Sequence, residues 1–364
     1  MRAFTRAAVI VVVLLVSGAI AYIASAPHPR VAAWAQGRPS FNSALPASAA
    51  PTAVAPGALP DPLIPDRPMA IDSAARPDAG DWVNARPAFQ YSHTAAERGG
   101  IEPCATDVAA SSAFAAWAPL GQGHFTAPSS GALDASGHFD LVIHLNGDEP
   151  VRRELIASQQ HFVLYTLTLD ANQGYAPLFT GTHLLESIVR EIEQALSRRQ
   201  GKPALVGHIA LSAWSAGFVG IEAALGQPTS KEVDAVILID GLHAPRGDRA
   251  AFQAQLQPFL AYAQRAANGE RFFFVSHSSI DPPDFASTTE AAHYLIASLG
   301  GRPQAVRRSD AMGLELVEAF DRRDFHVRGY AGNDKADHCA QLAVLRDVYV
   351  ALGRRWAVPV SAPP

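Results

Sequence analysis

A serine in a tight turn is the residue of this chain whose setting most suggests chemistry. Ser215 lies between an apolar run, residues 209–213, and a stretch with helical character that ends at Gly226. A turn from strand to helix pushes a serine hydroxyl out at the carboxyl end of the strand, beside helix N–H groups. Small residues are needed two positions before and after such a serine, and Ala213 and Gly217 occupy these positions. The spacing predicts a nucleophile, with alanine replacing the first glycine of a G-x-S-x-G elbow.

Serine is also a preferred helix N-cap, so the motif alone leaves that simpler role for Ser215 open. A serine nucleophile needs a base, and the base needs an orienting acid. His338 is the candidate base, because it lies late in the chain, in a loop ahead of a final helix predicted over residues 338–352. His243 and His277 are weaker rivals, since they lie nearer the candidate acids.

Two aspartates compete for the role of the acid. Asp240 follows the apolar run 233–239 and precedes a glycine, which places it at the end of a predicted strand. Asp281 lies in the loop after another apolar run, next to two prolines that indicate a stiff turn. We favour Asp240 and keep Asp281 as the alternative acid.

The elements that must position these residues alternate between strands and helices. Near-continuous apolar strands separated by helices indicate a mostly parallel sheet with helices on both faces, a three-layer α/β fold. Ligands of such sheets gather at the carboxyl ends of the strands, where the candidate residues lie. The predicted strands are residues 139–145, 162–169, 209–213, 233–239, 271–275 and, as the last one, 314–320. The predicted helices, besides the one after Ser215 and the final one, are residues 182–199, 249–267 and a capping-box helix from Ser287 to Leu299.

At this point the chain resembles the α/β-hydrolase superfamily, without features of a specific subfamily. The resemblance covers residues 139–356 and rests on the strand order, on the elbow around Ser215 and on the late Asp337-His338-Cys339. It implies a three-layer fold and a serine hydrolase whose serine, acid and histidine follow in that chain order.

The resemblance also implies an oxyanion hole for the tetrahedral intermediate. One donor is the backbone N–H of Ala216, directly after the serine. The other comes from the loop after residues 139–145, at Asn146 and Gly147, where His-Leu-Asn-Gly is similar to a family loop that carries a second histidine. A simple Asn-Gly turn is the alternative reading of this loop.

The first 85 residues differ in composition from the rest. Residues 1–26 combine two arginines, an apolar run and an Ala-Ser-Ala end, which predicts a signal peptide or an N-terminal membrane anchor. Residues 27–85 are rich in alanine, proline and serine and predict a disordered linker. The α/β-hydrolase-like domain follows at 86–356, with a tail at 357–364. We therefore expect export to the cell envelope or beyond.

Two cysteines, Cys104 and Cys339, are present. An even count in an exported chain predicts that they form a disulfide, which would tie the first segment of the domain to the region of His338.

Composition and missing motifs exclude other classes of function. The formal net charge of −5 and the pI near 6.2 leave no basic footprint for nucleic acid. The sequence has no metal-binding motif, no P-loop and no dinucleotide fingerprint, so we expect neither a metal nor another cofactor. The sequence does not indicate an oligomeric state.

The sequence therefore predicts an exported serine hydrolase that cleaves an ester or amide, from a small molecule or from the envelope, through an acyl-enzyme. A non-catalytic binding module on the same fold and an acyltransferase are the alternatives. The segment between Gly241 and Glu270 has room for little more than one helix, so no large lid is expected. Trp214, Tyr175 and Phe179 are candidate lining residues, although core packing is the commoner role of large aromatic side chains.

Overall fold

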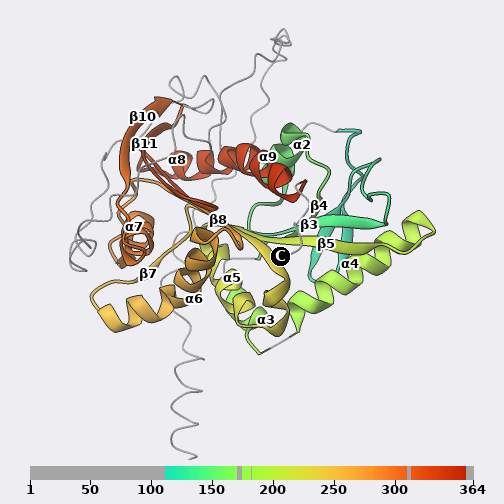
Figure 1. Ribbon diagram of the computed structural model, residues 1–364, viewed down its shortest axis with the longest axis horizontal. Helices are drawn as coiled ribbons and strands as arrows, with labels where there is room; N and C mark the ends of the chain where they lie inside the picture. Colours follow the sequence, from blue (N-terminus) through green and yellow to red (C-terminus); the bar gives the residue numbers. More distant parts are fainter. Residues whose placement is uncertain (1–110, 170–173, 182, 310–312, 358–364) are drawn as a thin grey trace, which may run out of the picture. The chain divides into compact units, whose positions relative to one another are not determined.

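A ten-stranded sheet is the frame on which the predicted site residues stand (Figure 1). The computed structural model describes residues 111–169, 174–181, 183–309 and 313–357. The order of the strands across the sheet is β1-β2-β4-β3-β5-β6-β8-β12-β11-β10. Their bounds are β1 Ala118–Leu120, β2 Gly123–Thr126, β3 His138–Leu145, β4 Val163–Leu167, β5 Leu205–Trp214, β6 Val233–Ile239, β8 Phe272–His277, β10 Gln304–Ser309, β11 Glu315–Arg322 and β12 Phe325–Tyr330.

The centre of the sheet is parallel and its two edges are antiparallel. Strands β4, β3, β5, β6, β8 and β12 pair in parallel with their neighbours. β2 joins β4 in the antiparallel sense, and β11 and β10 continue the other edge in the same way. This order, with a sharp turn and a helix after β5, is the α/β-hydrolase arrangement, and the predicted fold class is confirmed.

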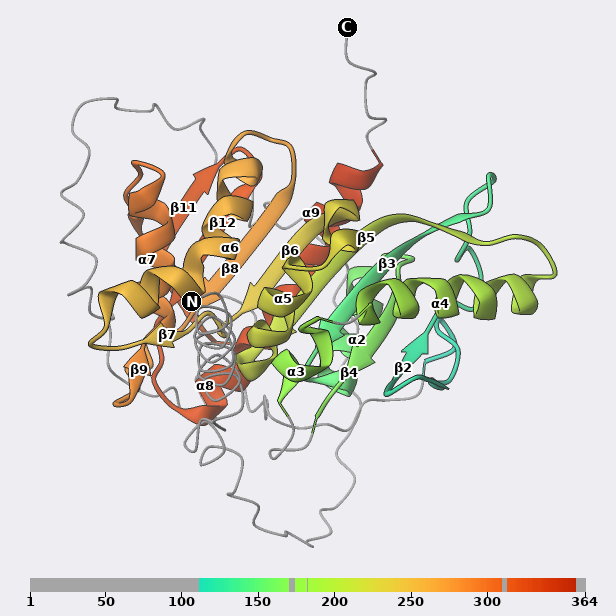
Figure 2. The ribbon, with the colours of Figure 1, turned by 90° about the horizontal axis from the view of Figure 1, so that it is seen from below.

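Helices cover both faces of the sheet, as Figure 1 and the view from below in Figure 2 show. On one face lie α2 (Asp148–Ser158), α8 (Lys335–Ala340) and α9 (Leu345–Trp356). On the other lie α3 (Tyr175–Phe179), α4 (Leu184–Gln200), α5 (Phe218–Leu225), α6 (Arg249–Ala267) and α7 (Thr288–Ser298). Two short strands, β7 (Ala244–Pro245) and β9 (Phe285–Ala286), pair outside the main sheet.

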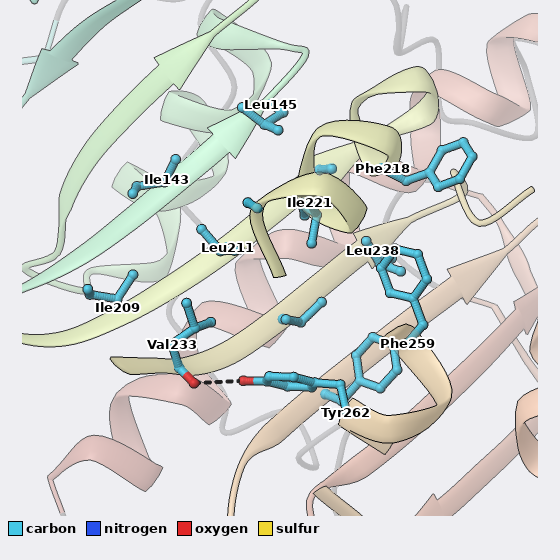
Figure 3. Close-up of a cluster of buried hydrophobic side chains, with 14 of the residues drawn as sticks. Ile143, Leu145, Ile209, Leu211, Phe218, Ile221, Val233, Leu238, Phe259 and Tyr262 are labelled. Carbon is cyan, nitrogen blue, oxygen red and sulfur yellow. Dashed lines mark hydrogen bonds between the residues drawn. The ribbon is translucent and has the colours of Figure 1, made fainter. Parts of the chain in front are cut away.

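Alternation along the strands divides the core between the two layers. In β3, Ile143 and Leu145 pack into the cluster under α4, α5 and α6, whereas Val142 packs into the cluster under α2 and α9. Figure 3 shows the first cluster, where the hydroxyl of Tyr262 in α6 donates to the backbone oxygen of Val233 at 3.1 Å. Burying one such aliphatic or aromatic side chain contributes about 1.5–3 kcal/mol. The strand ends that carry the site are therefore fixed on both sides.

Most predicted elements agree with the structure. The helix predicted over residues 249–267 has the bounds of α6, and α7 begins with the predicted capping box between Ser287 and Glu290. The segment between Gly241 and Glu270 holds β7 and α6, in agreement with the absence of a large lid.

The C-terminal part of the prediction was wrong in two places. The strand predicted at 314–320 corresponds to β11 but is not the last, because the chain turns at Arg323, whose φ is 51°, and returns as β12. β12 was missed because His326 and Arg328 interrupt its apolar pattern, and both pair with Asp321, at 2.6 and 2.9 Å. The second error concerns His338, which lies inside the short helix α8 rather than in a loop.

Several predictions fall on residues outside those described. These are the signal peptide or anchor at 1–26, the linker at 27–85, the first part of the domain at 86–110, and the tail from residue 358. Within the described ranges, no helix has the length and apolar character needed to cross a membrane.

Candidate active site

The turn after β5 holds Ser215 in a strained backbone conformation. Its φ is 54°, in the left-handed region that costs a non-glycine residue on the order of 1 kcal/mol. A short 3-10 helix, Ser215–Gly217, follows at once and leads into α5. Ser215 remains half-buried, so it retains some contact with solvent. This is the sharp strand-to-helix turn that the sequence predicted.

Close backbone contacts explain the small residues of the elbow. A Cβ at Gly217 would lie 2.3 Å from the backbone oxygen of Leu145 at the end of β3. A Cβ at Gly220 would lie 2.5 Å from Cδ1 of the same leucine. Ala213 is 1% exposed and pairs between Leu145 and Leu238 in the middle of the sheet, so its methyl group packs in the core. The alanine is therefore compatible with the turn.

The structure brings Asp240 and His338 together. Oδ2 of Asp240 lies 2.6 Å from Nδ1 of His338, across 98 residues of sequence. The other carboxylate oxygen accepts two hydrogen bonds, from the backbone N–H of Ser278 at 2.8 Å and from the hydroxyl of Thr288 at 2.9 Å. Asp240 itself follows β6 with a φ of 42°. Both oxygens of this carboxylate are thus held in fixed directions.

These contacts decide the protonation state of Asp240. Burial acts to raise the pKa of its carboxyl group. The hydrogen bond and charge of His338, together with the hydrogen bonds from Ser278, outweigh burial and lower the pKa to about 2. Asp240 is therefore a carboxylate at neutral pH. Such an acceptor on Nδ1 fixes the tautomer of the imidazole and leaves Nε2 for proton transfer.

The segment carrying His338 contacts the elbow directly. Nε1 of Trp214 donates to the backbone oxygen of His338 at 3.1 Å, and the two rings lie 4.8 Å apart between centroids. Helix α8 starts with a capping box between Asp334 and Asp337, which fixes the start of this short helix. His338 is thus held from two sides.

The acid segment contacts the elbow too. A Cβ at Gly241, directly after Asp240, would lie 2.4 Å from the backbone oxygen of Ser215 and 2.8 Å from its nitrogen. The backbones at Asp240 and Ser215 are therefore packed against each other. Serine, acid and histidine segments converge at one end of the sheet, each from a different strand end.

The alternative acid and the rival bases lie in other surroundings. Asp281 is 43% exposed and pairs with Arg246 at 2.6 Å, and Arg246 also contacts Glu290. Nδ1 of His243 lies 3.2 Å from the backbone oxygen of Ala286, and burial lowers the pKa of His243 to about 4. Nδ1 of His277 lies 3.1 Å from the hydroxyl of Thr289. The structure brings His338 to Asp240 instead.

The predicted oxyanion loop follows β3 and is already hydrogen-bonded. The backbone N–H of Asn146 donates to Leu167 at 3.0 Å, and that of Gly147 donates to the hydroxyl of Thr168 at 3.0 Å. The side chain of Asn146 donates to the backbone oxygen of Trp214 at 3.2 Å. For this loop to donate a hydrogen bond to an oxyanion, one of these three hydrogen bonds must break. The N–H of Ala216 lies in the first turn of a helix, where N–H groups have no partner within the helix.

A buried histidine shapes this loop. His144 in β3 has its Nε2 2.8 Å from the backbone oxygen of Asn146 and its Nδ1 2.8 Å from the hydroxyl of Ser212. Burial lowers the pKa of His144 to about 4, so the ring is neutral at pH 7. Its contact with Asn146 supports the left-handed turn there, whose φ is 76°.

The remaining predicted residues have simple placements. Tyr175 and Phe179 are buried in the core, whereas Trp214 is half-buried against His338. Cys339 is buried beside His338, but Cys104 lies outside the described residues. The disulfide between them stays a prediction.

Sequence reasoning missed the two residues that hold the second oxygen of Asp240. Thr288 was noticed as part of a helix start, and its hydroxyl in fact reaches Asp240. Ser278 follows β8, and its strand-end position was the signal that could have found it.

Sequence reasoning also found no metal motif. Among the residues that the structure describes, one group offers metal-ligand chemistry: His277, His293 and Glu318, whose ligand atoms lie within 4.8 Å of one another. They are separated by 16 and 25 positions in the chain and form no local pattern.

Comparison with known proteins gave structural likenesses at low identity. No family model and no curated protein matches the chain. Ferric enterobactin esterase from Salmonella typhimurium is 12% identical, with 65% of this chain aligned to 56% of that one at a TM-score of 0.39. A puromycin-hydrolyzing peptidase from Mycobacterium tuberculosis is 12% identical, over 63% of this chain and 38% of that one, at 0.36. The AtxE2 isopeptidase is 11% identical, with 66% of this chain aligned to 39% of that one at a TM-score of 0.36. The chain thus spans little more than half, or less, of these structures.

Proposed function

We propose that this chain is a serine hydrolase that cleaves an ester or amide through an acyl-enzyme. Ser215 is the nucleophile, His338 the base and Asp240 the acid that orients it. The observation that carries the proposal is the 2.6 Å contact between Asp240 Oδ2 and His338 Nδ1, beside a serine in a left-handed turn. An N-capping serine would need neither the strained turn nor an oriented imidazole beside it.

In the first half of the reaction, Oγ of Ser215 attacks the substrate carbonyl carbon while Nε2 of His338 takes the hydroxyl proton. The imidazolium that forms is stabilised by the carboxylate of Asp240, which stays ionised because its pKa is lowered to about 2. The N–H of Ala216 donates to the developing oxyanion. His338 then passes the proton to the leaving alcohol or amine, and the acyl group remains on Ser215.

In the second half, His338 removes a proton from water, and the oxygen of that water attacks the acyl carbon. His338 then returns the proton to Oγ of Ser215 as the bond between Oγ and the acyl carbon breaks and the acid is released. Acyl transfer to another acceptor would use the same residues. Hydrolysis is the reaction that we propose, because Ser215 is half-buried rather than sealed and the segment between Gly241 and Glu270, which the structure describes in full, holds no large lid. The substrate is a small molecule or comes from the cell envelope, since the composition of residues 1–26 supports export.

The proposal is tested by turnover of chromogenic esters and amides of graded acyl length. Ser215→Ala should reduce kcat by about 10⁴-fold or more, because the nucleophile of the acyl-enzyme is lost. Ser187→Ala, a change on α4, is the matched control and should keep the activity of the unchanged chain. A folded unchanged chain that turns over none of the panel would favour a binding module, and equal activity of the Ser215 variant would refute the assignment.

A further inference from the structure

Three residues from neighbouring elements meet around one carboxylate oxygen. His277 is the last residue of β8, Glu318 lies in β11 and His293 lies in α7, which packs over this part of the sheet. Oε1 of Glu318 is 2.6 Å from Nε2 of His293 and 2.9 Å from Nε2 of His277. Two imidazoles and a carboxylate thus converge from three elements.

The sheet register explains how two of them reach each other. Gly329 in β12 lies between β8 and β11 and is paired with His277 on one side and Glu318 on the other. Residues directly opposite on neighbouring strands share a face of the sheet. A Cβ at Gly329 would lie 2.6 Å from Nε2 of His277 and 2.5 Å from Cγ of Glu318. The glycine therefore leaves the space in which the two side chains meet.

The hydrogen bonds of Thr289 fix the tautomer of His277. The hydroxyl of Thr289 donates to the backbone oxygen of Ser278 at 3.0 Å, so towards His277 it acts as an acceptor. Nδ1 of His277, 3.1 Å away, therefore carries the proton. In the neutral ring Nε2 then bears a lone pair.

This nitrogen lies against a carboxylate oxygen. Nε2 of His277 is buried and lies 2.9 Å from Glu318 Oε1, so the ring nitrogen and the carboxylate face each other directly. His277 is 3% exposed, so water does not readily satisfy this atom. A buried imidazole nitrogen and a carboxylate oxygen that face each other need a cation between them, either a proton or a metal ion.

We propose that His277, His293 and Glu318 bind one divalent transition-metal ion of the Zn²⁺ class. Two imidazole nitrogens and one carboxylate oxygen are a donor set that suits zinc rather than the all-oxygen preference of Mg²⁺ or Ca²⁺. The contact between His277 Nδ1 and Thr289 is the outer hydrogen bond that orients a metal-bound histidine. Ligands of a tetrahedral zinc lie about 3.3 Å apart, so the carboxylate oxygen and the two ring nitrogens move apart by about 0.4–0.7 Å as the ion enters. His293 and Glu318 are partly exposed, which leaves access for the ion and for a water ligand.

The ion would join three elements next to the proposed acid. Ser278 and Thr288 both donate to Asp240. Their chain neighbours are His277, a proposed ligand, and Thr289, which contacts that ligand. A metal at His277 would therefore fix β8, α7 and β11 relative to one another. Its role is structural, because it would hold the elements that carry the two donors to Asp240.

The test uses the full chain, treated with EDTA, desalted and titrated with ZnCl₂ by calorimetry. The unchanged chain should bind one equivalent, keep it through a second desalting as judged by elemental analysis, and melt at a higher temperature with zinc than without it. Glu318→Gln and His293→Ala should each bind at least about tenfold more weakly, with no rise in melting temperature.

His208→Ala is the matched control, since His208 pairs with a single carboxylate, that of Asp140, at 2.7 Å. It should bind zinc like the unchanged chain. Failure of the unchanged chain to bind zinc, or equal binding by the Glu318 and His293 variants, would overturn the proposal. The proposal stands or falls independently of hydrolase activity, because its readouts are metal content and melting temperature.

Discussion

Two carboxylates of this molecule lie against imidazoles, and their surroundings differ. Asp240 meets one imidazole with Oδ2 and accepts two hydrogen bonds with Oδ1, from Ser278 and Thr288. Glu318 presents a single oxygen, Oε1, to two imidazoles. The first arrangement fixes one ring and leaves its second nitrogen available. The second places both rings on the same atom.

The difference separates the site that we propose moves a proton from the site that we propose holds an ion. An aspartate with its other oxygen saturated is a fixed acceptor, and the imidazole on it keeps one tautomer. A carboxylate shared by two imidazoles gathers three possible metal-ligand atoms, two ring nitrogens and one oxygen, around one point, which is the geometry of a metal ligand set. The sites are adjacent, because Ser278 and Thr288 of the first are the chain neighbours of His277 and Thr289 of the second.

The largest effect expected from breaking the first arrangement is at Asp240 itself. Asp240→Asn removes the charge and the acceptor that set the tautomer of His338, and kcat should fall by about 10⁴-fold. Asp281→Asn is the matched control, because Asp281 is exposed and paired with Arg246. Its kcat should stay within about twofold of the unchanged chain. Comparable losses in the two variants, or a larger loss at Asp281, would reverse the choice of acid.

A smaller effect is expected when one supporting hydrogen bond is removed. Thr288→Val deletes the hydroxyl that donates to Asp240 at 2.9 Å and keeps the side-chain volume. A hydrogen bond to a charged group contributes about 1.5–3 kcal/mol, so kcat should fall about tenfold or somewhat more, with KM little changed. Thr288→Ser retains the hydroxyl and should restore most of the activity. An unchanged kcat in the valine variant would show that Oδ1 of Asp240 does not need this donor.

The smallest effect expected concerns stability at acid pH. The pKa of Asp240 is lowered from 3.8 to about 2 by His338 and Ser278, despite burial. The carboxylate therefore stabilises the folded state above pH 4, and this contribution is lost as pH falls through about 2. Its size is on the order of 2 kcal/mol.

Urea unfolding at pH 5, 4 and 3 measures this contribution. The unfolding free energy of Asp240→Asn should be lower at pH 5 and should fall less steeply towards pH 3 than that of the unchanged chain. Parallel slopes would show that Asp240 does not titrate differently in the folded and unfolded states.

The sequence predicted the elements whose pattern is local and apolar. Helix α6 and the strand before Asp240 carry continuous or periodic apolar residues, so their bounds could be predicted closely. β12 could not be predicted, because Arg328 is buried within the sheet and its charge is matched by Asp321, a residue of another strand. The pairing of charges across strands is not visible in the pattern of one strand.

The candidate site shows the same limit. Ser215, Asp240 and His338 could be proposed because each lies at an apolar strand end or in a family-like motif. Thr288 and the group at His277 depend on strand order, since β12 must run between β8 and β11 before Gly329 can let His277 and Glu318 meet. Nothing in the spacing of these residues indicates that contact.

The central claim is that Ser215 is activated by His338 and Asp240, and labelling with a fluorophosphonate tests it most directly. Intact and peptide mass spectrometry should find one covalent adduct per chain, on the peptide that contains Ser215. His338→Ala and Asp240→Asn should label far more slowly than the unchanged chain, and Ser187→Ala should label at the unchanged rate. A folded chain that takes no label, or an adduct on a different residue, would contradict the account.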